Sequence, residues 1–250
     1  HASEGSLPEN SGEIAETLFD TMVPAMAAEL SQPGRGLALR RYREIVVFAV
    51  TALREVICRL KLSVKQVETF LEAPWELSVD PGGTKIAVLF RGFADMELAD
   101  EGGNPFVLDL KYSYAENYYI DLVSSGTALQ LASYAWLVEK HSGRHAIESG
   151  YFLLPKGKII TDSPRAGDGA VDSERTLSEV WRRGEHSVTR ALRRLYTEGI
   201  VDVTGLQEAE GDDAAELRKE TIEESGGLYA EPPCRFCDYS VICGNGRGAI

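Results

Sequence analysis

The sequence predicts an α/β fold in which a mixed central β-sheet is flanked by helices. Three observations favour it: two helix-like segments come first, short β-rich segments follow from about residue 61, and further helix-like and strand-like segments then alternate. In such a fold each helix has one apolar stripe, which is buried against the sheet. With 250 residues and 44% hydrophobic content, the chain is long enough to form a substantial core.

The N-terminal part is predicted to be helical after a flexible start. Residues 1–12 are polar and rich in Ser, Glu and Gly, so we expect a flexible terminus there. From Glu13 to Leu30 apolar residues recur every four positions, as in an amphipathic helix. A second helix is expected from about Leu37 to Leu60. Its predicted inner face consists of Tyr42, Ile45, Val46, Ala49, Leu53, Val56 and Ile57.

The next segments have the composition of β-strands. Alternating or continuous apolar runs predict strands at residues 64–70, 75–79, 85–98 and 106–112. Turn-forming residues separate the second strand from the third at 80–83, and the third from the fourth at 100–105. Residues 116–119 are expected to form an irregular polar and aromatic connection.

Helices and one more strand complete the pattern. A helix is expected at 125–141, a buried strand at 147–155, a mobile loop at 161–173 and a helix at 176–196. The outer face of the last helix is basic, which fits either a solvated face or a DNA contact. Its arginines are Arg182, Arg183, Arg190, Arg193 and Arg194.

We therefore expect a single domain from residue 13 to residue 250. It comprises a helical part at 13–60, an α/β core at 61–200, and a C-terminal part at 201–250. That last part holds an acidic, partly helical segment and a cysteine motif.

The net charge of −13 at first disfavours a nucleic-acid partner, because phosphate binding needs a basic surface. The acids are concentrated, however. Residues 1–30 carry six acids and no Lys or Arg, and residues 198–231 carry eleven acids against two basic residues. The rest of the chain is close to neutral, so the charge does not exclude a nucleic-acid substrate.

The sequence shows no membrane-spanning segment and no signal peptide. The apolar stretch at 45–60 is interrupted by Arg54, Glu55 and Arg59, and no run of eighteen apolar residues occurs. A soluble cytoplasmic protein without a membrane partner is expected.

The cysteines are predicted to be reduced thiols. Cys234, Cys237 and Cys243 lie within ten residues, which is typical of a metal or cluster site, and zinc and iron–sulfur both remain open. Cys58 brings the number of cysteines to four. It is either a further ligand or a buried structural residue of its helix.

Two acids and a lysine on predicted strands form the candidate catalytic site. Asp95 ends one apolar segment, and Asp109 ends the next with Lys111 two residues later, so that both of these side chains share a face. We expect Asp95, Asp109 and the carbonyl of Leu110 to bind Mg²⁺ or Mn²⁺. Lys111 would then orient the attacking water or stabilise developing charge.

This pattern resembles the PD-(D/E)XK nuclease superfamily, in particular its RecB-like branch with AddB-type exonuclease domains. The matching residues are Gly92–Asp95, Val107–Lys111, Gln130–Tyr134 and the motif Cys234-x2-Cys237-x5-Cys243. The resemblance implies a restriction-endonuclease-like fold. It implies catalytic Gln130 and Tyr134 on a helix, where they position the site or DNA, and it also suggests an acidic position at Glu68.

The resemblance further implies that the three C-terminal cysteines bind a [4Fe-4S] cluster whose fourth ligand is open. Branch members often carry a histidine metal ligand on an early helix. Here only His1 precedes His141, and His1 is either native or a tag residue.

The sequence thus predicts a Mg²⁺- or Mn²⁺-dependent DNA nuclease domain of exonuclease type. We expect it to be part of a longer helicase–nuclease protein of DNA repair, with a helicase subunit or domain as its partner. The alternative is a catalytically inactive module of the same fold that binds DNA or a partner subunit.

Overall fold

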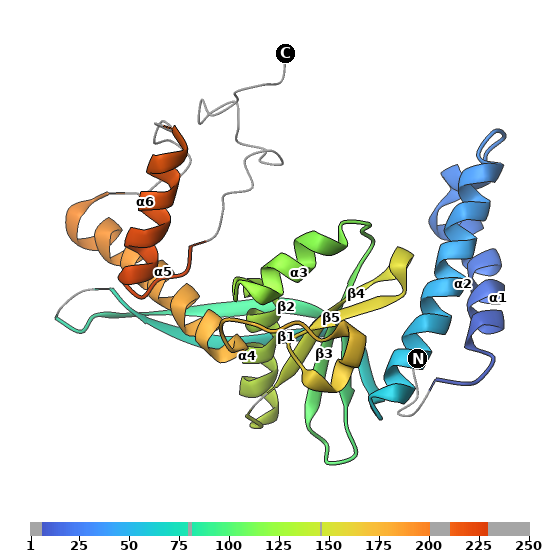
Figure 1. Ribbon diagram of the computed structural model, residues 1–250, viewed down its shortest axis with the longest axis horizontal. Coiled ribbons are helices and arrows are strands. Elements are labelled where there is room, and N and C mark those ends of the chain that lie inside the picture. The colour runs from blue at the N-terminus through green and yellow to red at the C-terminus, as the bar shows by residue number, and fades with distance from the viewer. Residues whose placement is uncertain (1–6, 80–81, 146, 201–210, 230–250) are drawn as a thin grey trace. The chain divides into compact units, whose positions relative to one another are not determined.

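The computed structural model of the protein describes residues 7–79, 82–145, 147–200 and 211–229 (Figure 1). The chain divides into two compact units. The first comprises residues 1–73 and 91–177, and the second residues 74–90 and 178–250. In the described part of the chain, no helix has the length and apolar character needed to cross a membrane.

The sheet is mixed, as the sequence predicts. Its strand order is β1-β2-β3-β4-β5, with β2 antiparallel to β3, β3 parallel to β4, and β4 antiparallel to β5. The parallel pair requires a crossover, which the helices between β3 and β4 supply. The strands are β1 (Ser63–Ser78), β2 (Lys85–Ala99), β3 (Pro105–Lys111), β4 (Glu148–Leu153) and β5 (Lys158–Thr161).

Helix α2 (Gly36–Arg59) covers one face of the sheet. Its apolar stripe packs with every second residue of β2 and β3, as the two periodicities require. Core residues of this layer are Ala49, Leu53, Val56, Ile57, Met96, Leu98, Phe106, Leu108, Phe152 and Ile159. Tyr42, predicted to lie on the inner face, is instead exposed, because it precedes the part of α2 that packs into this layer.

Helix α1 (Ser11–Met26) lies beside α2 (Figure 1) and is followed by the 3₁₀ turn η1 (Ala28–Ser31). Arg43 of α2 forms ion pairs with Glu16 and Asp20 of α1. The expected helix is present, but most of its apolar stripe is exposed, because α1 contacts α2 rather than the sheet. The exposed residues of this stripe are Ile14, Leu18, Met22 and Met26.

The opposite face of the sheet is covered by α3 (Glu116–Ser124) and α4 (Leu129–Ser142). They bury Val123, Ala128 and Leu131 against Tyr151, Leu153 and Ile160 of β4 and β5. This second layer contains the candidate site, since the odd-numbered residues of β3 face it.

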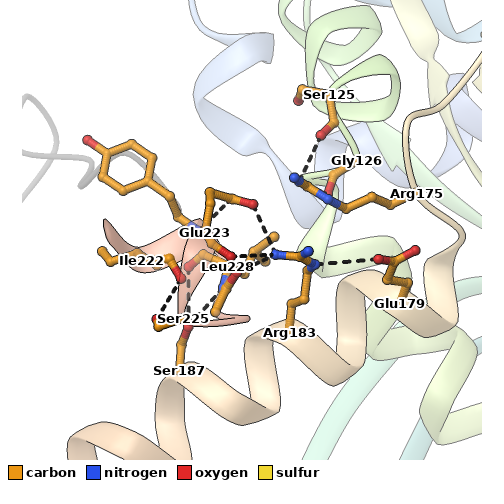
Figure 2. Close-up of polar contacts among 12 residues, drawn as sticks. Ser125, Gly126, Arg175, Glu179, Arg183, Ser187, Ile222, Glu223, Ser225 and Leu228 are labelled. Carbon is orange, nitrogen blue, oxygen red and sulfur yellow. Dashed lines mark hydrogen bonds and ion pairs between the residues drawn. The ribbon is translucent and has the colours of Figure 1, made fainter. Parts of the chain in front are cut away.

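In the second unit, α5 (Leu177–Glu198) and α6 (Gly211–Glu224) are joined by polar contacts. Figure 2 shows Arg183 bonded to Glu179 and Glu223, while Ser187 bonds to Leu228. Three of the five arginines considered above form ion pairs with glutamates: Arg182, Arg183 and Arg194. Arg190 donates to Ser225, so these contacts favour a structural role over a free basic stripe.

Five details of the structure differ from the sequence predictions. Residues 64–70 and 75–79 belong to one long strand, β1, and residues 116–119 begin the helix α3. The expected loop at 161–173 contains the 3₁₀ segment η3 (Pro164–Gly169), and β5 was not predicted. The short turn η2 (Leu154–Lys156) separates β5 from β4. Cys58, for which a buried structural position was one of the two alternatives, is an exposed free thiol, because it points away from the face of α2 that carries Ile57.

Candidate active site

Strand pairing brings the two predicted acids together. The register of β2 and β3 pairs Met96 with Leu108, and one further step places Asp95 opposite Asp109. The Oδ2 atom of Asp95 accepts a hydrogen bond of 2.6 Å from the backbone N–H of Leu110. This bond holds the Asp95 carboxylate against β3 where β3 ends.

Asp109 and Lys111 point to the same face, as their spacing predicts. The Nζ atom of Lys111 lies 2.6 Å from Oδ2 of Asp109, and the exposed fractions of the two side chains are 25% and 2%. That oxygen is buried and accepts no well-aligned hydrogen bond, so its contact with Lys111 is an ion pair. The Asp109 carboxylate is therefore held in place on the face of β3 that also carries Lys111.

The two groups influence each other's ionisation. Burial raises the pKa of Asp109 and the nearby Asp95 adds to this, whereas the Lys111 ammonium offsets part of the effect. Burial acts to lower the pKa of Lys111, but Asp109 outweighs burial and the pKa of Lys111 is raised. Lys111 is consequently a cation at neutral pH.

Helix α4 adds two polar side chains. The Nε2 atom of Gln130 donates to Oδ1 of Asp109 at 3.0 Å and to the hydroxyl of Tyr134 at 3.2 Å. These residues are one turn apart, so a single helix face presents both of them to β3. The structure thus brings together all five predicted catalytic residues.

Gly92 explains how Tyr134 approaches the sheet. A Cβ atom at position 92 would lie 3.4 Å from Cε1 of Tyr134 and 3.3 Å from Cδ1 of Leu137. The missing side chain leaves space for α4 to lie close to β2. The glycine of the Gly92–Asp95 motif therefore has a packing function beside the site.

Tyr151 is a site neighbour that sequence reasoning missed. It pairs with Asp109 in the parallel register of β3 and β4, and it is 2% exposed. Burial first and Asp109 second raise the pKa of its hydroxyl. Only the register identifies it, since nothing in the run Glu148–Leu153 distinguishes this tyrosine from a core residue.

The ligand set fits Mg²⁺ or Mn²⁺. Among the described residues, no group of three or more His, Cys, Asp or Glu side chains forms a metal-binding cluster. Mg²⁺ does not require three such side chains, because it retains several water ligands and binds only one or two carboxylates. The N–H and C=O of a strand residue face the same side, so the carbonyl of Leu110 faces Asp95 as its N–H does.

Other predicted residues lie away from this group or outside the described residues. Glu68 is an exposed residue of β1 with a φ of 50°, which marks a local irregularity of the strand. His1 and the three clustered cysteines lie outside the described residues, so the predictions for them stand untested. These cysteines are Cys234, Cys237 and Cys243.

Two carboxylates, a strand carbonyl and a lysine on adjacent strands define a class of site suited to metal-dependent phosphodiester hydrolysis. The chain belongs to the PD-(D/E)XK nuclease superfamily, whose model matches residues 2–244. Its mixed five-stranded sheet with flanking helices is the restriction-endonuclease-like fold expected for that family. Nucleases of this superfamily act on nucleic acids and generally use Mg²⁺.

Comparison with individual proteins adds no further detail. No curated protein matches the sequence. One matching solved structure is the crystal structure of SSO0001, at 13% identity over 97% of this chain and 87% of that chain. The TM-score of 0.31 is too low to support an argument. The RecB-like branch thus stays a prediction.

Proposed function

We propose that the protein is a Mg²⁺- or Mn²⁺-dependent DNA nuclease domain that degrades DNA from an end. The observation that carries the proposal is the network around Asp109. Its buried carboxylate is bonded to Lys111 and Gln130 and stands opposite Asp95 across two adjacent strands. A buried acid with this many polar partners is typical of a functional site.

The residues have distinct proposed roles. Asp95, Asp109 and the carbonyl of Leu110 would hold the cation, which when bound neutralises phosphate charge and acidifies a water molecule. The Lys111 ammonium would orient that water or stabilise charge developing on the phosphate. Gln130 would fix the Asp109 carboxylate through its bond to Oδ1, and Tyr134 would fix Gln130 in turn.

Cleavage of end-labelled linear DNA and of circular DNA, with and without Mn²⁺, tests the proposal. We expect wild-type protein to degrade linear DNA only with the metal, and Asp109→Ala to abolish this activity. Asp168→Ala is the matched control, because Asp168 is an exposed acid of η3 outside the site. Undiminished cleavage by Asp109→Ala would contradict the assignment, and equal cleavage of circular DNA would contradict the exonuclease mode.

A second candidate is a catalytically inactive module that binds DNA or a partner subunit. The Asp109–Lys111 ion pair favours it, because Lys111 already neutralises the carboxylate that a cation needs. Titration calorimetry separates the two candidates. Binding of Mn²⁺ by wild-type protein, lost in Asp109→Ala, supports the nuclease, whereas no heat of binding supports the inactive module.

We also propose that the domain works within a longer helicase–nuclease protein of DNA repair and carries a [4Fe-4S] cluster. The motif Cys234-x2-Cys237-x5-Cys243 supports the cluster. Absorption at about 400 nm, with iron and sulfide in equal amounts, is the expected signature. Bound zinc without sulfide would replace the cluster proposal. Because Cys58 is an exposed free thiol, Cys58→Ser tests whether it supplies the fourth ligand.

A further inference from the structure

Tyrosines gather at the end of β3 that leads out of the candidate site. Four of the ten tyrosines of the chain lie between residues 112 and 119, directly after Lys111. Tyr42 of α2 joins them, although it is seventy residues away along the chain. This grouping has no part in the proposed chemistry.

Three of these rings form a continuous exposed surface. The centroids of Tyr42 and Tyr112 are 5.7 Å apart, and those of Tyr112 and Tyr114 are 6.3 Å apart. The exposed fractions of Tyr42, Tyr112 and Tyr114 are 39%, 49% and 50%. Ring spacings of this size are typical of interacting aromatic pairs, so the three rings support one another while their outer faces remain in solvent.

Arg41 gives this surface a positive charge. Its Nη2 atom donates to the hydroxyl of Tyr114 at 3.1 Å, and its guanidinium carbon lies 5.8 Å from the centroid of the Tyr114 ring. The guanidinium is thereby held over the Tyr114 ring while Arg41 stays exposed. We call Arg41, Tyr42, Tyr112 and Tyr114 the tyrosine platform.

The platform is connected to the site by a short stretch of chain. Tyr114 is three positions after Lys111 in the chain, a span of at most about 11 Å between Cα atoms. A second set of rings runs back towards the carboxylates. Tyr118 contacts Tyr119 at 5.2 Å, and Tyr119 contacts Tyr151 at 4.8 Å, beside Asp109.

Structural packing alone does not account for the platform. Tyr42, Tyr112 and Tyr114 belong to neither of the two apolar layers that cover the sheet. Exposed aromatic rings next to a cation form the chemistry that binds unpaired nucleobases, because each base has a π-face and each nucleotide a phosphate. Paired bases in a duplex keep their faces stacked on one another, so they cannot use such rings.

We propose that the tyrosine platform binds single-stranded DNA by stacking unpaired bases on Tyr42, Tyr112 and Tyr114, with Arg41 contacting the phosphates. The strand then passes Lys111 into the catalytic site. This inference rests on the proposed nuclease function and names its substrate: a single-stranded end rather than a blunt duplex.

Fluorescence anisotropy of a labelled oligothymidine, recorded in EDTA so that no cleavage occurs, tests the platform separately from catalysis. We expect Tyr112→Ala and Tyr114→Ala each to weaken binding about 5- to 160-fold, which is the effect of losing the stacking of one base. Tyr112→Phe keeps the ring and should bind as wild type does. Tyr196→Ala is the matched control, because Tyr196 is an exposed tyrosine of α5.

The outcomes separate the two proposals. Variants that lose oligothymidine binding while wild-type protein cleaves no DNA with Mn²⁺ would support the platform and contradict the nuclease. Variants that bind oligothymidine and cleave DNA as wild type does would contradict the platform proposal but not the nuclease proposal. The same result is expected if these rings contact a protein partner instead of DNA. Equal losses in Tyr196→Ala, or equal weakening for a blunt duplex, would overturn it as well.

Discussion

The ion pair between Lys111 and Asp109 offers the sharpest test of the site's energetics. Replacing Lys111 with Met keeps a long apolar side chain on β3 and removes the cation that lies beside the carboxylate of Asp109, which is 2% exposed. Breaking a fully buried pair costs about 3–5 kcal/mol, and an exposed pair contributes about 0–1 kcal/mol. Because Lys111 is 25% exposed, we expect an intermediate loss of about 2–3 kcal/mol at pH 7.

Thermal unfolding followed by circular dichroism measures this loss, which corresponds to a melting temperature lower by roughly 4–12 °C for a chain of this size. Lys158→Met is the matched control. Lys158 pairs with Glu116, but the two side chains are 39% and 25% exposed. Its removal should therefore cost less than about 1 kcal/mol.

The pH dependence has a definite sign. Lys111 lowers the pKa of Asp109, so its removal raises that pKa further above the value of the unfolded chain, about 3.9. A folded state that binds its proton more tightly than the unfolded state gains stability as the pH falls through the raised pKa. The deficit of Lys111→Met should thus shrink on acidification. A deficit equal to that of Lys158→Met, or one that does not change with pH, would refute the reasoning.

Three further outcomes are expected. Asp95→Asn keeps an oxygen that can accept the hydrogen bond from the Leu110 N–H, so the melting temperature of the variant should stay within a few degrees of wild type. Calorimetry should show no Mn²⁺ binding to this variant. Retained binding would argue against Asp95 as a metal ligand. Gly157→Ala should lower the free energy of unfolding in urea by about 1–3 kcal/mol, because φ of Gly157 is 60° and the new Cβ would lie 2.7 Å from a side chain of α2. Gly143→Ala is the control: φ of Gly143 is 68° but no atom lies within 4 Å of its new Cβ, so this variant should lose only the smaller stability that the backbone strain costs. Asp100→Ala should cost about 1–3 kcal/mol through the turn hydrogen bonds of its carboxylate. Those bonds lower the pKa of Asp100, so the wild-type advantage should persist at neutral pH and disappear as the pH falls through that lowered pKa, and a constant difference would contradict this account.

Elements that depend on local sequence pattern could be predicted before the fold was known. Strand alternation was sufficient to place Asp109 and Lys111 on one face, and helical spacing was sufficient to pair Gln130 with Tyr134. The long helix α2 and the strand β3 follow from hydrophobic periodicity, which is strong over those residues.

Elements whose local signals conflict with their packing were predicted less well. Separate strands were predicted at 64–70 and 75–79, yet β1 continues through Pro74, because β1 lies at the edge of the sheet where a missing N–H is tolerated. Residues 116–119 contain adjacent tyrosines and were not read as helical. Packing of Tyr119, Ile120 and Val123 against β4 and β5 stabilises α3 there.

Contacts between residues that are distant in the sequence could not be predicted without the fold. The antiparallel register of β2 and β3 sets Asp95 against Leu110, and the parallel register of β3 and β4 places Tyr151 beside Asp109. The contact of Tyr42 with Tyr112 likewise depends on how α2 crosses the sheet. Registers and helix placement result from the joint packing of both faces, which no single segment of sequence encodes.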